Sequence, residues 1–207
     1  MLLLDIGNSS IKLRGEDGAI VRRSPEGFDY PEEPFCYINV NPTQERTVAA
    51  LPHARDLGGL FRFESRYAGM GVDRIAACYT IEEGVVVDAG SAVTVDLMRE
   101  GGHAGGFIMP GFSATKACFA NISSRLRYDP DETVPLDALP QNTADALRYA
   151  TIKPLLLMIA DTAEGLPIYL TGGDARRIAY YLEDATVIED LVFRGMEKVI
   201  KESGITC

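Results

Sequence analysis

The chain has 207 residues, a formal net charge of −10 and an ordinary 46% of apolar residues. A chain of this length can bury a substantial core, either as one large domain or as two smaller lobes. The acidic balance argues against a nucleic-acid-binding surface, because such a surface needs clustered Lys and Arg to displace counterions. An anionic ligand would therefore be held by local hydrogen-bond donors rather than by the field of the whole protein.

The cysteines and histidines give no sign of a zinc site, because they are few, scattered and without a C-x-x-C pair. The cysteine pattern is typical of a reducing compartment, where buried thiols act as small apolar residues. No apolar run approaches the roughly 20 residues of a membrane span, and no signal-peptide pattern opens the chain. We therefore expect a cytoplasmic protein without membrane contact. The cysteines are Cys36, Cys78, Cys118 and Cys207.

The residue pattern in the first part of the chain predicts short strands. Residues 2–6 form an apolar run too short for a helix, and residues 9–14 alternate apolar and charged side chains. A glycine-rich turn leads to a strand over 19–23, and a further buried strand is expected over 35–40. Residues 43–51 favour a short helix.

From Val72 onward, strands and helices alternate. The amphipathic stripe between Ala144 and Thr162 predicts a helix that Pro154 should kink or interrupt. The expected strands cover residues 84–88, 91–98, 104–109, 167–170 and 185–188, and the remaining helices begin at Val72 or cover 113–126, 175–183 and 191–203.

One short pattern occurs twice. Asp5-Ile6-Gly7 and Asp88-Ala89-Gly90 each follow an apolar run and precede small polar residues. Such an internal repeat indicates two related lobes, residues 1–82 and 83–207, rather than one continuously wound sheet. A ligand between the lobes would face one Asp-x-Gly turn from each.

These turns suit a nucleotide. Glycine lets the backbone approach a ligand closely, and Asn8 and Ser9 add side-chain donors for phosphate oxygens. Because the carboxylate alone would repel phosphate, it implies an intervening cation such as Mg²⁺, which takes one or two carboxylates plus substrate phosphates. A single Asp-x-Gly hairpin tip is usually only structural, but two copies in matched contexts weaken that alternative.

Three further motifs have both a functional and a structural interpretation. The turn Thr171-Gly172-Gly173 could carry a flat adenosine or merely connect a strand to a helix. Residues 105–111 could aim a helix N-terminus at an anion or form a proline turn. Asp73 could be only an acidic residue of a first helical turn, yet Asp73 and Arg74 are neighbours that do not face each other. They could therefore address a substrate hydroxyl and a substrate carboxylate, respectively.

Taken in order, the motifs resemble those of the type III pantothenate kinases, members of the superfamily of sugar kinases, heat-shock protein 70 and actin. The resemblance implies an α/β fold of two duplicated ribonuclease-H-like (actin-like ATPase) lobes with mixed β-sheets flanked by helices. The matching residues are Asp5 to Ser9, Gly71 to Arg74, Asp88 to Ala92 with Thr94 and Asp96, residues 105–111, Asn142 with Thr143, and Thr171 to Asp174.

The same resemblance implies a homodimer that phosphorylates pantothenate with ATP, the first step of coenzyme A biosynthesis. By the match, Asp73 is the general base, Asp5 positions Mg²⁺ through water, and Asp88 holds the monovalent cation, K⁺ or NH₄⁺. The implied pantothenate-binding residues are Tyr67, Gly71, Val72, Arg74, Gly106 and Thr143, the last reaching the partner subunit's pocket. The implied ATP-binding residues are Asp5, Gly7, Asn8, Ser9, Lys12, Gly90, Ser91, Ala92, Gly172 and Gly173.

The chain departs from the family pattern in two ways. Ser9 and Ser91 stand where threonine is usual, and both keep the hydroxyl. The segment before Gly71 is short, and Tyr67 is the nearest candidate for the family's pocket tyrosine. Two alternatives remain: a kinase for another small hydroxyl substrate, or a regulatory homologue of the transcription-accessory type without catalysis.

Overall fold

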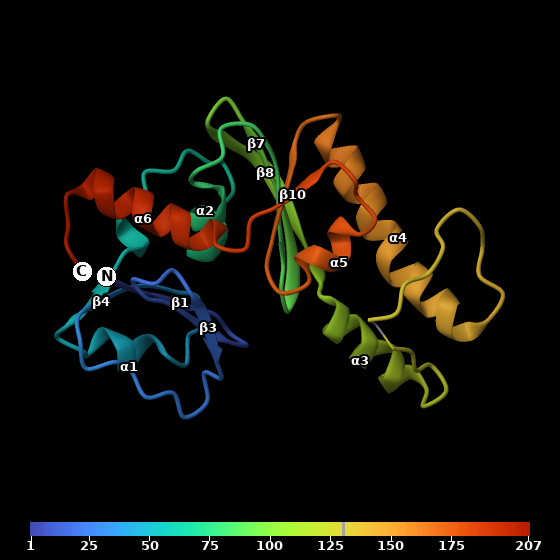
Figure 1. The fold of residues 1–207 in the computed structure, drawn as a ribbon, viewed down its shortest axis with the longest axis horizontal. Helices are drawn as coiled ribbons and strands as arrows, with labels where there is room; N and C mark the ends of the chain where they lie inside the picture. Colours follow the sequence, from blue (N-terminus) through green and yellow to red (C-terminus); the bar gives the residue numbers. More distant parts are fainter. Residues whose placement is uncertain (130) are drawn as a thin grey trace. The chain divides into compact units, whose positions relative to one another are not determined.

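The computed structural model describes residues 1–129 and 131–207 (Figure 1). The chain packs into two compact units. The first comprises Met1–Glu82, Gly101–His103 and Asp190–Cys207, and the second comprises Glu83–Glu100 and Ala104–Glu189. Each unit is built on a five-stranded mixed sheet with flanking helices, which is the α/β architecture expected from the sequence.

The sheet of the first unit has the strand order β3-β2-β1-β4-β5. Its strands β1, β2 and β3 are antiparallel neighbours, whereas β4 runs parallel to β1 and β5 parallel to β4. Buried side chains such as Leu4, Ile11 and Phe35 form its core. The strands are β1 (Leu2–Ile6), β2 (Ile11–Arg14), β3 (Ile20–Arg23), β4 (Phe35–Asn39) and β5 (Ala54–Asp56).

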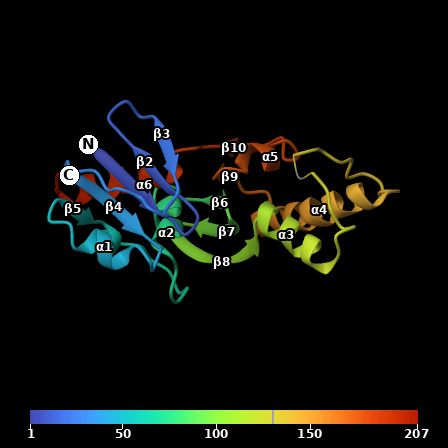
Figure 2. The same ribbon diagram turned by 90° about the horizontal axis from the view of Figure 1, so that it is seen from below.

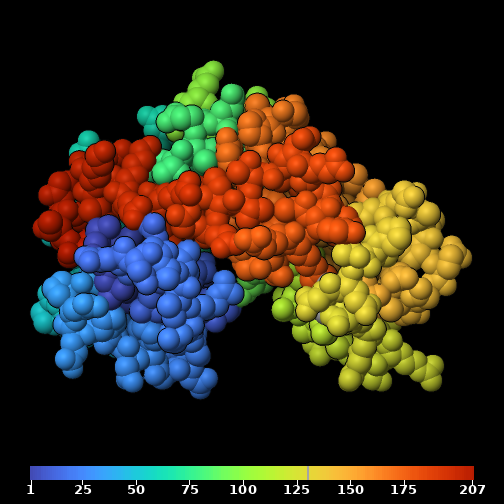
Figure 3. Space-filling view, in the orientation of Figure 1, coloured from blue at the N-terminus to red at the C-terminus, as the bar shows by residue number. Residues whose placement is uncertain are grey.

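Helices cover both faces of this sheet. Figure 1 shows α1 (Glu45–Ala49) on one side and α2 (Val72–Cys78) and α6 (Leu191–Ser203) on the other. A 3-10 turn, η1 (Gly58–Leu60), precedes the loop that leads into α2. The helices α2 and α6 pack closely, and α6 also contacts β1, so that the C-terminal segment lies against the N-terminal strands in Figure 3.

The close approach of α6 and α2 depends on a glycine. A Cβ atom on Gly195 would collide with the backbone carbonyl of Ala76. Residues 190–207, which the sequence analysis grouped with the second lobe, therefore pack with the first unit. Their apolar stripe fits the face of α2, a long-range contact that the local sequence pattern does not specify.

The expectation of four free thiols is wrong. Cys36 in β4 forms a disulfide with Cys207, and their Cα atoms lie 5.4 Å apart, a normal separation for such a bond. The sequence hid this pair because the return of the chain after α6 brings together residues 171 positions apart. Cys78 is a buried cysteine outside this disulfide, as expected, and Cys118 is an exposed one.

The second sheet repeats the topology of the first. Its order is β10-β9-β6-β7-β8, with β6 antiparallel to β7 and parallel to β9, just as β1 is antiparallel to β2 and parallel to β4. Figure 2 shows β6, β7 and β8 side by side. The strands are β6 (Gly84–Ala89), β7 (Ala92–Arg99), β8 (Gly102–Pro110), β9 (Ile168–Thr171) and β10 (Ala185–Val187).

The described residues of the second unit also form the helices α3 (Phe112–Ile122), α4 (Thr143–Ala163) and α5 (Ala175–Ala179). Leu155 of α4 and Ile178 of α5 join one apolar core with Val85 and Val87 of β6. The helix α4 continues through Pro154 rather than ending there. Pro154 lies on the exposed side, and the buried residues around it hold the helix against the sheet.

Candidate active site

The first Asp-x-Gly motif forms a tight hairpin between β1 and β2. The Gly7 N–H donates to the Ser10 carbonyl at 3.0 Å, and a Cβ on Gly7 would press on the same oxygen. Asp5 is 4% exposed and lies opposite Lys12, whose Nζ donates to Asp5 Oδ2 at 2.9 Å. The turn thus combines a buried, charge-paired carboxylate with the exposed Asn8 beyond it.

A residue that the sequence analysis missed braces this hairpin. Asn41 is 4% exposed, and its Nδ2 donates to the Gly7 carbonyl at 3.2 Å. Its Oδ1 accepts from both the backbone N–H and the hydroxyl of Thr43. The available signal was its place just after β4, because the carboxyl ends of the parallel strands β1 and β4 lie at the same edge.

Asp73 belongs to the first turn of α2, a helix that begins directly after Gly71. A Cβ on Gly71 would lie 2.6 Å from Asp73 Oδ1, so glycine leaves room for this carboxylate. Burial raises the pKa of Asp73, and the negative charge of Asp5 acts in the same direction. The backbone N–H of Arg74, which donates to Oδ1 at 2.8 Å, and the charges of Lys12 and Arg74 lower it in part. The structure thus brings Asp73 together with the Asp5 hairpin.

Arg74 is buried below an aromatic ring. Its side chain is 5% exposed, and its guanidinium carbon lies 4.6 Å from the ring centroid of Tyr67. This distance is typical of a cation–π contact. Tyr67 is the tyrosine that was assigned from the sequence to the substrate pocket. In the structure it contacts Arg74, the residue expected to bind the substrate carboxylate.

The second Asp-x-Gly motif lies at the hairpin between β6 and β7. Gly90 N–H donates to the Ala92 carbonyl, and Gly111 N–H donates to the Ser91 carbonyl, each at 3.0 Å. A Cβ on Gly111 would collide with the backbone at Gly90 and Ser91. The predicted segment 105–111 therefore ends directly against the predicted nucleotide turn.

The Thr171-Gly172-Gly173 turn, at the end of β9, contacts the same hairpin. Asp88 pairs in register with Thr171, and a Cβ on Gly172 would collide with the Asp88 carboxylate. Gly172 has a φ of +89°, a conformation that glycine adopts readily. The Asp174 N–H donates to the Ala89 carbonyl at 3.0 Å. Two motifs that were ambiguous alone thus meet at Asp88.

Other predicted residues occupy separate elements. Gly106 lies in β8, and Thr143 is the exposed first residue of α4, after Asn142, whose Oδ1 accepts from the Asp145 N–H at 2.9 Å. Within the described part of the chain, no group of three or more His, Cys, Asp or Glu side chains could enclose a metal ion. The same residues include no helix long and apolar enough to cross a membrane.

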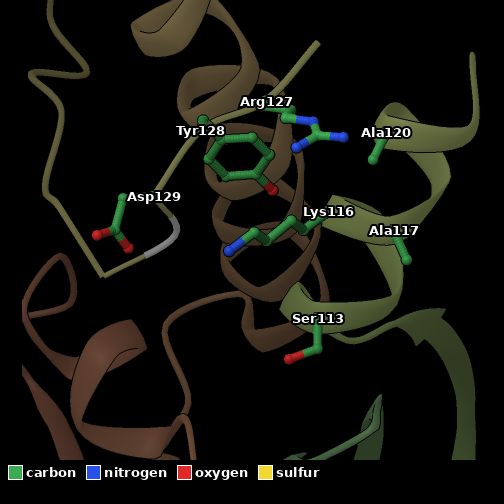
Figure 4. Close-up of a pocket in the computed structure, with 7 residues that line it drawn as sticks. All are labelled: Ser113, Lys116, Ala117, Ala120, Arg127, Tyr128 and Asp129. Carbon is green, nitrogen blue, oxygen red and sulfur yellow. The ribbon is translucent and has the colours of Figure 1, made fainter. Parts of the chain in front are cut away.

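A cavity of about 670 Å³ in the second unit contains none of the predicted site residues. Figure 4 shows the Lys116 side chain extending from α3 toward Tyr128 and Asp129. Arg127 adds a second cation, and alanines of α3 provide an apolar wall.

The topology of the two sheets defines the chain as an actin-like ATPase fold. An archaeal actin homologue of known structure aligns with a TM-score of 0.52 at 11% identity, covering 98% of this chain and 100% of the other. Residues 48–164 match the family model described as type III pantothenate kinase. The chain belongs to the type III pantothenate kinase family.

Full-length relatives support this assignment. A type III pantothenate kinase of Campylobacter jejuni is 42% identical over 204 residues, with 98% of both chains covered. One from Helicobacter hepaticus is 41% identical over 205 residues, covering 98% of this chain and 99% of the other. A solved Campylobacter jejuni structure, provisionally described as a Baf family transcriptional activator, aligns with a TM-score of 0.91 at 41% identity, covering 99% of both chains.

Proposed function

We propose that this family member transfers the terminal phosphoryl group of ATP to the primary hydroxyl of pantothenate, which yields 4′-phosphopantothenate for coenzyme A synthesis. The observation that carries the proposal is the partly buried Asp73 carboxylate beside the buried Arg74. A hydroxyl acceptor needs a base oriented toward its proton, and a carboxylate-bearing substrate needs a cation. Asp73 and Arg74 supply these two groups, and membership of the kinase family supports the same assignment.

Asp73 acts as the general base. Phosphoryl transfer depends mainly on positioning and charge stabilisation, so the orientation of the base counts more than its strength. Its Oδ1 accepts from the Arg74 N–H, which leads us to assign Oδ2 to the substrate hydroxyl proton. The burial that raises the pKa of Asp73 also makes its ionised form a stronger proton acceptor.

The first unit holds the phosphates. Asn8 and Ser9 provide donors beyond the Gly7 turn, and Lys12 adds a positive charge beside Asp5. A single buried carboxylate fits an ion that takes few protein ligands and completes its shell with water and phosphate oxygens. When bound, Mg²⁺ would neutralise phosphate charge. We assign Asp5 to orient it through water.

We also assign the hairpin between β6 and β7 and the turn after β9 to ATP binding. Gly90, Ser91 and Ala92 approach ATP through backbone atoms, and the Gly172-Gly173 turn provides a flat surface for adenosine. The Asp88 carboxylate lies against this turn and is our candidate ligand for K⁺ or NH₄⁺.

Pantothenate would be held by Arg74 at its carboxylate, with Tyr67, Gly71 and Val72 beside it. Gly106 would contribute backbone from β8. We further propose a homodimer in which Thr143, exposed at the start of α4, reaches the pantothenate pocket of the partner subunit.

The direct test is ADP release by the purified protein with pantothenate or a panel of sugars, each with and without K⁺. We expect release that requires pantothenate and increases with K⁺. Turnover of a sugar without turnover of pantothenate would identify a different kinase. Asp73→Asn serves as the control for contaminating kinases, because it removes the proposed base and leaves every residue of the nucleotide turns unchanged.

A regulatory role without catalysis is the second candidate, because the similar Campylobacter jejuni structure is described in those terms. The net charge of −10 weighs against direct DNA contact. The presence of Asp5, Asp73 and Asp88 weighs against an inactive site. A protein that releases no ADP with any acceptor but shifts DNA fragments in a gel would favour this candidate.

A further inference from the structure

The segment between η1 and α2 carries Tyr67 but contains little regular structure of its own. A short isolated bridge joins its Ser65 to His103, at the start of β8. His103 is 6% exposed and was given no role by the sequence analysis. A buried histidine at the anchor point of a substrate loop raises the question of what it holds in place.

His103 contacts the loop through backbone, side chain and ring. Its N–H donates to the Glu64 carbonyl at 3.0 Å. Its Nδ1 lies 2.7 Å from Ser65 Oγ, a hydrogen bond that either tautomer of the ring can form. The centroid of the imidazole ring also lies 5.8 Å from that of the Phe63 ring and 6.0 Å from that of the Tyr67 ring, the latter in an edge-on arrangement.

Ser65 connects His103 to Tyr67 through hydrogen bonds. The Ser65 hydroxyl oxygen accepts from the Tyr67 N–H at 3.0 Å, so a single oxygen connects His103 to the backbone of the tyrosine. The Tyr67 ring then lies over the Arg74 guanidinium at 4.6 Å. The result is a continuous series of contacts, His103 to Ser65 to Tyr67 to Arg74.

This series determines what Arg74 can do. An arginine side chain has many rotamers, and holding its plane against an aromatic ring before a ligand arrives removes part of the entropy cost of binding. A planar guanidinium fixed in advance favours a carboxylate that binds through two parallel hydrogen bonds. Tyr67 is 36% exposed, so without the Ser65 bond little else among its contacts described above would hold its backbone.

We infer that Ser65 and His103 are positioning residues for the carboxylate end of the acceptor substrate, acting through Tyr67 on Arg74. The inference rests on the proposed function, in which Arg74 binds the pantothenate carboxylate. Neither residue touches the reacting atoms. Their loss should therefore raise the KM for pantothenate and leave kcat nearly unchanged.

The test compares Ser65→Ala and His103→Phe with Ser65→Thr, which keeps the hydroxyl. His103→Phe keeps a ring of similar size but removes Nδ1. We expect the first two variants to raise the KM for pantothenate at least about fivefold, with kcat and the KM for ATP within about twofold of wild type. Ser65→Thr should remain close to wild type. Ser24→Ala is the matched control, because Ser24 makes the same kind of bond to a backbone N–H, that of Glu26, away from the site.

A double-mutant cycle tests the route through Tyr67. If Ser65 acts through the tyrosine, Ser65→Ala should have little further effect in a Tyr67→Ala background. Fully additive effects on the KM for pantothenate would overturn the inference, and so would an unchanged KM in both single variants. An equal rise in the KM for ATP would also overturn it, because it would indicate a general loss of structure.

Amide hydrogen exchange separates this inference from the proposed function. Without any substrate, Ser65→Ala should speed exchange in residues 61–71 relative to wild type and to Ser24→Ala. A wild-type protein that does not turn over pantothenate would defeat the proposed function, while faster exchange would still support the anchoring of the loop. Unchanged exchange of residues 61–71 in Ser65→Ala would overturn the anchoring of the loop, whatever the substrate is. This measurement needs no turnover, so it also applies to a variant that is too unstable for kinetics.

Discussion

Lys12 and Asp5 form an ion pair across the first hairpin, with Nζ 2.9 Å from Oδ2. The antiparallel register of β1 and β2 places the two residues directly opposite each other. The Asp5 side chain is almost completely buried, and the Lys12 side chain is more exposed. Because a buried carboxylate without a partner is strongly destabilising, the ion pair with this lysine offsets the cost of burying Asp5.

Asp5→Asn and Asp88→Asn should give different cation defects. Asp5→Asn removes the carboxylate assigned to orient Mg²⁺, and should raise the Mg²⁺ concentration for half-maximal activity at least about tenfold. Asp88→Asn should instead change the response to K⁺. Titration of each ion at a saturating level of the other measures both effects. Equal changes for both ions in both variants would mean that the roles of the two hairpins are not separate.

Asp73→Asn should lower kcat at least about 10²-fold, because it removes the carboxylate that we propose as the base for the acceptor hydroxyl. The KM for ATP should change little, since the nucleotide turns are untouched. Steady-state kinetics with ATP and pantothenate varied separately provide the measurement. A variant with unchanged kcat would exclude Asp73 as the base.

The same substitution should stabilise the fold at neutral pH. Burial raises the pKa of Asp73 in the folded state above its unfolded value of about 3.9, so ionisation costs folding free energy. This penalty is absent below the unfolded pKa, grows as the pH rises toward the raised pKa, and is fully present above it. Asparagine carries no charge and avoids the penalty.

Thermal unfolding of both proteins between pH 3.5 and pH 8, values chosen to bracket that range, tests the sign of this effect. The Tm of Asp73→Asn should exceed that of wild type at the upper end, and the difference should vanish at the lower end. Asp29→Asn, at an exposed position, serves as the control. A lower Tm for Asp73→Asn at neutral pH would show that contacts of the charged carboxylate outweigh its burial.

Gly195→Ala tests the contact between α6 and α2. Alanine has a higher helix propensity by about 1 kcal/mol, so an isolated helix would gain stability. In the protein, however, the new Cβ would collide with the Ala76 carbonyl, and such overpacking typically costs about 1–3 kcal/mol. We expect a lower Tm than wild type. Gly59→Ala is the control, since a Cβ there meets nothing within 4 Å.

Reduction of the Cys36–Cys207 disulfide should lower the Tm. A disulfide that closes a long loop contributes about 2–4 kcal/mol, which for a chain of this size corresponds to a shift of roughly 5–15 °C. Thermal unfolding with and without reductant measures it. Cys207→Ser should match the reduced wild type and be insensitive to reductant. Cys118→Ser, which removes an exposed free thiol, should behave as wild type. A wild-type Tm unaffected by reductant would contradict the expected contribution.

Local pattern predicted most of the strands and the two glycine hairpins, because alternation and glycine spacing depend on neighbours in sequence. The hairpins at Asp5 and Asp88 and the helix that begins at Val72 are examples. What local pattern does not encode is which distant surfaces meet. Three features depend on such contacts between distant segments: the packing of Gly195 against α2, the Cys36–Cys207 bond and the contact of His103 with Tyr67.

Candidate site residues could be named from the sequence where chemistry restricts the residue type, as for Asp73 in the resemblance motif. Supporting residues were not, because many residue types can brace a turn. Asn41 and Ser65 act through ordinary side-chain to backbone hydrogen bonds, and only the structure shows which backbone groups they reach.

The packing of α6 on α2 has a consequence for how the protein is made. Domains generally begin to fold on the ribosome from the N-terminal side, but the first unit needs residues 190–207, which are synthesised after the whole of the second unit. The helix α2, which carries Asp73, must therefore wait for its support until the second unit has emerged, while the second unit can fold earlier. A premature stop just after α5 would spare every residue assigned to the active site and still leave α2 without the helix that packs against it.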